Sequence, residues 1–301
     1  MRASATVVVV LALLGCSDDS GSKPADMAVE AKPADGAPDV ALPDQGGDAG
    51  LTCDTALLGV QCTPTGTECG AQMQCLASGF CSCPCTPDLP TTKLQNEDSC
   101  PVPGFACGLD AASKQQYCFA LLANTPQPPD CSEAGAINAD PTDPAFIVAA
   151  RITPTSYPFT VTGMRYMLQP PFAKGTDCDN GLAHRAELHV GDGATPQASP
   201  TIAASFDVAA DTATDAGRWV VHGLSTPVQL TTGQSIYLMV EIPARVGGKT
   251  LCPLVCSDNS PSGDRSFIDV DSNQPPYQWE SFKTKTWPTE LGFAALGFAG
   301  P

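Results

Sequence analysis

Apolar and polar side chains alternate over much of the C-terminal half of the chain. The alternation is clear in Phe159–Met167, and within Arg185–Val190 the residues Ala186, Leu188 and Val190 share one face. A period of two is that of a β-strand with one buried face. The pattern predicts these strands: Phe146–Ile152, Phe159–Leu168, Arg185–Val190, Ile202–Val208, Arg218–Val221, Ile236–Ile242, Arg265–Val270, Tyr277–Phe282 and Glu290–Phe298.

Short turn sequences separate these strands. Gly191–Gly193, Thr232–Gln234 and Ser262–Asp264 combine glycine with small polar residues, which favour tight turns. No run of the region has the helical period, and about 170 residues can bury a hydrophobic core. We therefore expect a mainly β protein in which residues 132–301 form a β-sandwich of the jelly-roll type.

The segment Trp219–Val240 adds a resemblance to this prediction. In it a strand ends, Pro227-Val-Gln-Leu-Thr-Thr-Gly233 turns the corner, and an aromatic-aliphatic strand returns. The segment resembles the middle of many extracellular bacterial jelly-roll domains, and the likeness extends to the closing strand that begins at Glu290. Carbohydrate-binding modules and adhesin-like domains share this architecture, so the resemblance implies recognition of a glycan or a protein.

Residues 1–15 have the order of a secretory signal peptide. Arg2 gives a positive start, Ala5–Gly15 is uncharged and mostly apolar, and a small residue precedes Cys16. The apolar run is too short to cross a bilayer, which needs about 20 residues.

Leu13-Leu14-Gly15-Cys16 resembles the lipobox of bacterial lipoproteins. The resemblance makes Cys16 the lipidated first residue of the mature chain, with a diacylglycerol and usually an amide-linked acyl chain such as palmitate. Two or three acyl chains anchor a protein stably, because each buried methylene contributes about 0.8 kcal/mol. An ordinary signal peptide with an incidental cysteine is the alternative. Ser17, where an aspartate would favour the inner membrane, favours the outer membrane or cell surface.

Residues 16–52 are predicted to be a disordered acidic tether. They are rich in aspartate, alanine, proline and glycine, and Lys23-Pro-Ala-Asp26 recurs as Lys32-Pro-Ala-Asp35. Such a segment cannot bury enough apolar surface to offset its chain entropy. It would hold the folded part a few nanometres from the membrane.

Residues 53–131 are predicted to form a small module that depends on disulfides, because they combine many cysteines with few apolar side chains. An exported, cysteine-rich chain folds in an oxidising compartment. With Cys16 set aside, ten cysteines lie between Cys53 and Cys118 and four follow from Cys131 onward, so each part is expected to close its own bridges. The predicted disulfide-forming residues are Cys53, Cys62, Cys69, Cys75, Cys81, Cys83, Cys85, Cys100, Cys107, Cys118, Cys131, Cys178, Cys252 and Cys256.

A metal site is the alternative use of these cysteines, since Cys81-Ser-Cys83-Pro-Cys85 brings three thiols together. However, no Cys-x2-Cys spacing occurs, and residues 53–131 contain no histidine. Structural zinc sites usually have such spacings. Disulfides are therefore the favoured interpretation.

The formal net charge of −17 is spread over every part of the mature chain. This acidity argues against nucleic acid as a partner, because nucleic-acid binding relies on lysine and arginine. It also argues against adhesion to anionic lipid through a basic patch. Membrane attachment is therefore expected through the lipid anchor.

Asp269-Val-Asp271-Ser-Asn273, followed by Glu280, has the oxygen spacing of a calcium loop. Gln274 stands where the helical calcium hand has glycine, prolines follow, and the flanks are predicted strands. We therefore expect no cofactor, with calcium held between strands by these four residues as the alternative.

Tyr277, Trp279 and Trp287 cluster near the C-terminus. Sugar-binding jelly rolls use such rings as stacking platforms, which makes these residues candidates for ligand binding. Core packing against Phe267 or Phe293 is the alternative.

His184 and His189 flank Glu187, which raises the hypothesis of a metal or acid–base cluster. On a strand, a separation of five sends the two histidines to opposite faces. Glu187 and His189 share the outward face with Arg185, and an exposed polar face is the interpretation we favour. His222 stands alone near a strand end and is expected to be structural.

The sequence has no Gly-x-Ser-x-Gly, His-Glu-x-x-His, phosphate loop or dinucleotide fingerprint. We therefore expect a non-enzymatic envelope or surface lipoprotein that binds an extracellular glycan or protein. The first alternative is a structural or assembly role, docked on an envelope partner protein. The second is an extracellular hydrolase with an unrecognised site.

Overall fold

The computed structural model describes residues 9–11, 53–86, 100–124, 134–137, 139, 143–168, 177–211, 218–256, 263–287 and 289–300. All regular elements in these ranges are strands, so the predicted mainly β fold is confirmed. Within the same ranges, no helix is long and apolar enough to cross a membrane. Cys16, the predicted tether up to residue 52, and Cys131 lie outside the described residues.

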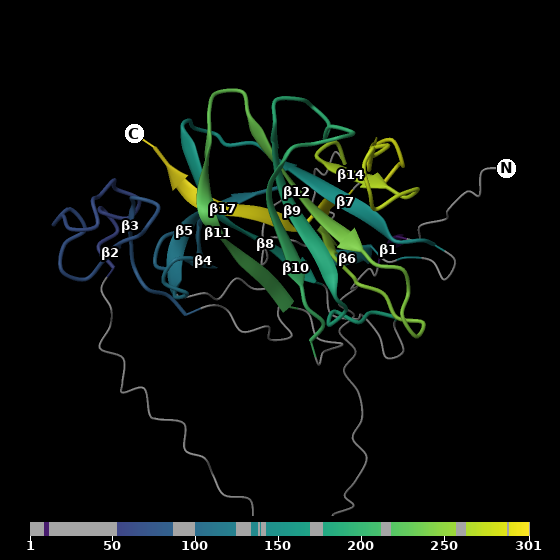
Figure 1. Cartoon of the computed structure of the whole chain (residues 1–301), viewed down its shortest axis with the longest axis horizontal. Helices are drawn as coiled ribbons and strands as arrows, with labels where there is room; N and C mark the ends of the chain where they lie inside the picture. Colours follow the sequence, from purple (N-terminus) through teal and green to yellow (C-terminus); the bar gives the residue numbers. More distant parts are fainter. Residues whose placement is uncertain are drawn as a thin grey trace, which may run out of the picture.

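Two antiparallel sheets form the body of the molecule (Figure 1). The six-stranded sheet has the order β10-β9-β12-β7-β14-β15, and the five-stranded sheet has the order β11-β8-β17-β5-β4. The first comprises β10 (Ile202–Val208), β9 (His184–Gly191), β12 (Ser235–Ile242), β7 (Phe146–Ile152), β14 (Ser266–Asp269) and β15 (Glu280–Ser281). The second comprises β11 (Arg218–Leu230), β8 (Phe159–Leu168), β17 (Phe293–Ala299), β5 (Gln116–Ala123) and β4 (Phe105–Leu109).

The hydrophobic core lies between these two sheets. Val148 of β7 and Leu238 of β12 enter it from one side, and Val161 of β8 and Phe293 of β17 enter it from the other. All four are fully buried. Two sheets that each bury one face produce the period of two seen in the sequence. The predicted β-sandwich is therefore confirmed.

Several predicted strands have the observed bounds, among them Phe146–Ile152, Phe159–Leu168 and Ile202–Val208. The prediction of a strand at Tyr277–Phe282 was wrong in its bounds, because β15 covers only Glu280–Ser281. The backbone N–H of Tyr277 donates to the carbonyl of Ala198, 2.7 Å away in another loop, instead of joining a ladder. The residues before β15 therefore form a cover over the six-stranded sheet.

A smaller sheet has the order β1-β6-β13-β16. Its strands are β1 (Val9–Leu11), β6 (Ala134–Ile137), β13 (Leu254–Cys256) and β16 (Glu290–Leu291). The disulfide Cys178–Cys252 lies buried beside Ala136 of β6. β1 falls within the predicted signal peptide. An apolar run can pair with an open sheet edge, and removal of residues 1–15 would make β6 the edge strand.

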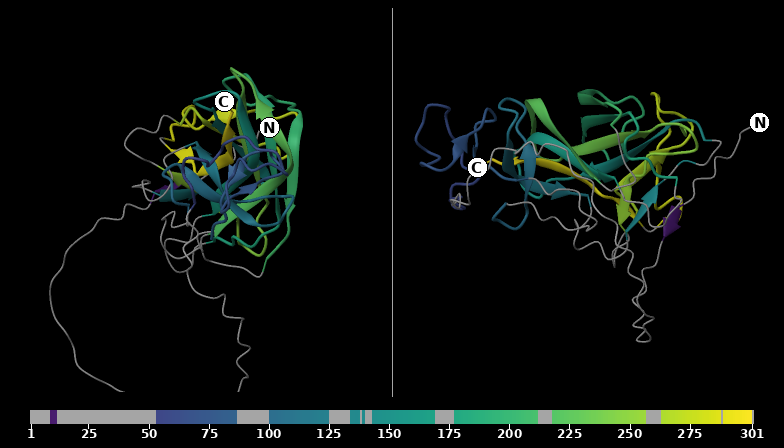
Figure 2. Two further views of the ribbon diagram at one scale, coloured as in Figure 1. Left: turned by 90° about the vertical axis from the view of Figure 1, so that its left-hand side faces the viewer. Right: turned by 90° about the horizontal axis from the view of Figure 1, so that it is seen from below.

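The cysteine-rich part projects from one end of the sandwich, around β2 (Gln74–Cys75) and β3 (Cys81–Ser82), as the views of Figure 2 also show. The cysteines between residues 53 and 118 pair among themselves, so the predicted disulfide-rich region is confirmed. The bridges are Cys53–Cys83, Cys62–Cys75, Cys69–Cys81, Cys85–Cys107 and Cys100–Cys118. Cys256 is disulfide-bonded as well.

The sequence suggested a boundary between the cysteine-rich part and the sandwich at residue 131. The structure does not have this boundary. β4 and β5 lie within residues 53–131, yet β5 pairs with β17 and so belongs to the five-stranded sheet. Leu76 and Phe80 pack on Phe119 and Phe298, which lie on the outer face of that sheet. The few apolar side chains of the cysteine-rich part are thus buried against the sandwich. The part outside the sandwich, here called the disulfide module, comprises residues 53–86.

Candidate functional site

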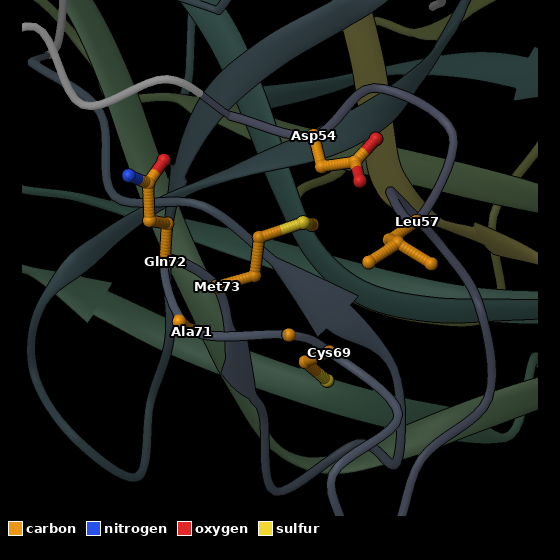
Figure 3. A pocket seen from close by; sticks show the side chains of 7 residues that line it. Asp54, Leu57, Cys69, Ala71, Gln72 and Met73 are labelled. Atoms are coloured by element: carbon orange, nitrogen blue, oxygen red, sulfur yellow. The ribbon is translucent and has the colours of Figure 1, made fainter.

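The disulfide module contains a surface hollow of about 280 Å³. Its wall includes Asp54, Leu57, Ala71, Gln72 and Met73. The side chains of Met73 and Leu57 point toward each other, and the carboxylate of Asp54 lies beside Leu57 (Figure 3). An apolar hollow with one carboxylate suits an apolar group that carries a neighbouring hydrogen-bond donor.

The covalent framework fixes the wall of this hollow. The bridge Cys69–Cys81 ties the wall to β3, and Gly70 follows with a φ of +68°, which non-glycine residues rarely adopt. The carboxylate of Asp54 accepts a hydrogen bond of 3.1 Å from the backbone N–H of Ala56, which orients it at the start of a turn. The hollow is therefore formed before any ligand arrives.

A second candidate site lies on the outer face of the six-stranded sheet, where Arg185, Glu187 and His189 follow one another on β9. His189 Nε2 lies 2.8 Å from Glu187 Oε2, and Arg185 Nε lies 3.0 Å from Glu187 Oε1. Glu187 is only 4% exposed and His189 only 1%. The expected exposed polar face is therefore wrong, because loops cover these side chains.

The loop after β14 covers these side chains and forms hydrogen bonds with them. Arg185 Nη2 donates to the carbonyl of Asn273 at 2.7 Å, and Asn273 Nδ2 donates to Glu241 Oε1 on β12 at 2.7 Å. Glu241 Oε2 in turn lies 3.8 Å from Arg185 Nε. A hollow of about 120 Å³ lies at this place. Its wall includes Arg185, Glu187, His189, Pro200, Ile202 and Tyr277.

The ionisable groups of this site influence one another. Burial alone would raise the pKa of Glu187, but the hydrogen bond with His189 and the charge of Arg185 together lower it. Burial raises the pKa of Tyr277, and the carboxylate of Glu187 adds to that effect. Glu187 and Glu241 both contact Arg185, so the two carboxylates share a guanidinium instead of facing each other across an open cleft.

The residues proposed as calcium ligands enter separate interactions. Asp269 is buried, and its two oxygens accept backbone N–H groups from Asp271 at 3.0 Å and Gln278 at 2.7 Å. Glu280 forms an ion pair with Lys285 at 2.5 Å. The carboxylate of Asp269 therefore organises the covering loop.

The three candidate aromatic residues do not form one surface. Tyr277 is buried and packs in a small cluster with Phe267, and Trp279 tilts against it with ring centroids 5.0 Å apart. Trp279 Nε1 donates to the carbonyl of Gln197 at 3.0 Å. Trp287 packs edge-on against Phe282 at 5.3 Å. Trp279 and Trp287 remain partly exposed.

The remaining histidines lie on the other side of the six-stranded sheet or on the facing sheet. His184 Nε2 and the hydroxyl of Tyr166 are 2.6 Å apart, and His184 Nδ1 lies 2.8 Å from the carbonyl of Leu182. His222 of β11 stacks on Phe206 of β10 with centroids 4.4 Å apart. Burial, with a smaller contribution from His184, lowers the pKa of His222 to about 4. These contacts suit structural roles.

Sulfur atoms gather at two places where a metal could be imagined, around Cys62, Cys69 and Cys75 and around Cys85, Cys100 and Cys118. All six belong to disulfides. A disulfide sulfur is not a thiolate and is a poor metal ligand. Adjacent bridges explain both groups.

Glu241 and the hollow of the disulfide module were not predicted from the sequence. Glu241 lies far from Glu187 along the chain, and the only signal was a carboxylate at the end of the apolar run Ile236–Val240. The hollow depends on the disulfide pairing, which the sequence does not specify.

No protein-family model and no curated protein matches this sequence. Among solved structures, it is similar to the cysteine protease and lectin-like domains of Cwp84, a surface layer associated protein of Clostridium difficile. The TM-score is 0.39 at 13% identity, over 55% of this chain and 34% of that one. A propeptide-cleaved form of the same clostridial protease gives a TM-score of 0.41 at 12% identity, over 63% and 45% of the two chains. The chain thus spans less than half of these structures, and any functional proposal rests on its own residues.

Proposed function

We propose that the protein is a lipid-anchored, non-enzymatic binding protein of the outer membrane or cell surface. The lipobox-like Leu13–Cys16 supports the anchor. The disulfides support an oxidising, extracytoplasmic compartment. The observation that carries a binding role is the preformed hollow of the disulfide module. This module projects from one end of the sandwich (Figure 1).

The chemistry of this hollow favours an extracellular protein over a glycan as the ligand. Leu57 and Met73 offer apolar surface, and methionine adapts its shape to different apolar side chains. Asp54 adds one carboxylate at the same place. A glycan remains the second candidate, since Trp279 is a partly exposed ring on the covering loop.

Binding of the soluble, oxidised chain 17–301 to cells that produce the protein tests this proposal. The cells are used untreated, after protease treatment and after periodate oxidation of their surface sugars. Loss of binding after protease alone indicates a protein ligand, and loss after periodate alone indicates a glycan. Absence of saturable binding to untreated cells overturns the binding function.

A matched pair of variants locates the contact. Met73→Asp places a charge in the hollow, whereas Val60→Asp places one at an exposed position of the same module outside the hollow wall. If the hollow is the binding site, the first variant loses binding at least tenfold and the second keeps it. Equal affinities of the two variants would show that the binding site is not in this hollow.

A further inference from the structure

The hollow on the outer face of the six-stranded sheet has an acidic environment. Glu187, Glu241 and Asp269 oppose a single guanidinium, that of Arg185, and all four act electrostatically on the hydroxyl of Tyr277 in the wall. The side chain of Arg151 lies two strands away from β9, where it donates to the carbonyl of Ala194 at 2.6 Å. The three carboxylates therefore outnumber the guanidinium around the hollow.

His189 supplies an acceptor in the same wall. The tautomer of His189 that donates from Nε2 to Glu187 carries a lone pair on Nδ1. Nδ1 is buried and has no hydrogen-bond partner among the described residues. A buried polar atom without a partner costs free energy unless a ligand or water satisfies it. A ligand with a hydrogen-bond donor would satisfy this acceptor.

The mouth of the hollow is apolar. Pro200, Pro275 and Ile202 line it together with the charged groups, and Ile202 is 52% exposed, which is unusual for a large apolar side chain. The volume of about 120 Å³ exceeds several times the roughly 30 Å³ share of one water molecule. A small head group with a short aliphatic stem would fit this shape.

We propose that this hollow binds a protonated primary amine on an aliphatic stem. The ammonium would donate to His189 Nδ1 and lie near Glu187 and Glu241, and the methylenes would cover Ile202 and Pro275. The amine can come from a lysine side chain of a protein or from a free alkyl diamine. An anionic ligand would be repelled by the excess of carboxylates. This inference goes beyond the proposed function, because it concerns the sandwich and does not need the membrane anchor.

Calorimetric titration of the soluble, oxidised chain 17–301 tests the proposal with three probes. Nα-acetyl-lysine amide represents a lysine in a protein, cadaverine represents a free diamine, and the Nε-acetylated form of the first probe is its uncharged control. We expect saturable binding of an amine on the order of millimolar, in line with so few contact atoms, and no binding of the acetylated form. A preference between the first two probes identifies the source. Equal binding of the acetylated form, or no binding of either amine, overturns the proposal.

Variants connect binding to the named residues. Glu187→Gln removes one carboxylate and should weaken amine binding at least tenfold, whereas Glu280→Gln, which lies outside the hollow wall, should leave it unchanged. Because Glu187 is buried and its loss could unfold the site, Ile202→Arg provides a second variant at an exposed position. A fixed cation at the mouth should also weaken binding at least tenfold. Unchanged affinity in a folded Ile202→Arg protein contradicts the assignment.

Discussion

Phe80 of the disulfide module stacks on Phe298 of the last strand, with ring centroids 4.9 Å apart and planes inclined by 24°. The two residues are 218 positions apart in the sequence, so this contact joins the module to the last strand of the chain. Phe80 is 4% exposed and Phe298 1%. The module is therefore held by hydrophobic packing as well as by its bridge Cys85–Cys107 to β4.

Phe80→Ala should destabilise the protein by about 3 kcal/mol, because it removes a buried aromatic ring and leaves a cavity against Phe298. Val60→Ala in the same module, at a position that is 39% exposed, should change stability by less than about 0.5 kcal/mol. Urea unfolding of both variants under oxidising conditions measures the difference. Equal midpoints would mean that the module does not depend on this contact.

A disulfide that closes a longer loop should contribute more to the free energy of unfolding than one that closes a shorter loop. Cys178–Cys252 has a sequence separation of 74, and Cys69–Cys81 has one of 12. The chain-entropy relation gives about 4.5 kcal/mol for the first and about 3 kcal/mol for the second. The members of each pair are similarly buried, at 7% and 0% against 6% and 0%, so loss of burial should be comparable.

Replacing both cysteines of one bridge by alanine tests this order. The variant without Cys178–Cys252 should lose about 1.5 kcal/mol more than the variant without Cys69–Cys81, as measured by urea unfolding. A larger loss from the short loop would show that local structure of the module, and not loop entropy, dominates.

Cys16→Ala should abolish membrane attachment. Without the thiol, a lipoprotein of the proposed kind has no site for its diacylglycerol, and no other anchor is proposed for the chain. The variant should move from the detergent phase to the aqueous phase in detergent partitioning, and intact-mass analysis should show the loss of acyl chains. Ser17→Ala serves as the control and should stay in the detergent phase. A Cys16→Ala protein that remains in the detergent phase contradicts the lipid anchor.

The sequence predicted the sandwich well because a buried sheet face leaves a period of two, which is readable in strands such as Phe159–Leu168. It did not predict that β4 and β5 join the five-stranded sheet, because both lie in the region assigned to the cysteine-rich module and the pairing of distant strands is not encoded locally. The candidate site was only partly predictable. Alternation placed Glu187 and His189 on one face, but a period cannot tell whether that face meets solvent or a loop around Asn273 that comes 84 positions after His189.

Asp269→Asn should destabilise the covering loop by about 1–3 kcal/mol. The amide has a single acceptor oxygen, so one of the N–H groups of Asp271 and Gln278 loses its partner in a buried place. Because both carboxylate oxygens are already occupied, added calcium should leave the thermal midpoint of the unmodified protein unchanged.

Thermal unfolding of the two proteins, each with calcium and with chelator, checks both statements. Glu280→Gln is the control, since it removes a carboxylate whose ion pair with Lys285 is partly exposed and contributes little. A calcium-dependent rise in the midpoint that Asp269→Asn abolishes would restore the calcium loop.

His222 should make stability fall on mild acidification. Its pKa is lowered from 6.5 to about 4, mainly by burial and secondarily by His184, so the folded state binds the proton less readily than the unfolded state. Above pH 6.5 the ring is neutral in both states and its contribution to stability is fully present. As the pH falls from 6.5 to about 4, only the unfolded state gains the proton and this contribution is lost. Allowing for screening of a partly exposed ring, the loss is on the order of 2 kcal/mol.

His222→Gln removes this titration while leaving the carboxylates of the chain in place. The fall in unfolding free energy between pH 7 and pH 4 should therefore be smaller in the variant by about 2 kcal/mol. A nuclear magnetic resonance titration of the ring in the unmodified protein should give a midpoint near pH 4. A midpoint near 6.5, together with equal pH dependence of the two proteins, would show that the stack on Phe206 leaves the ring open to water.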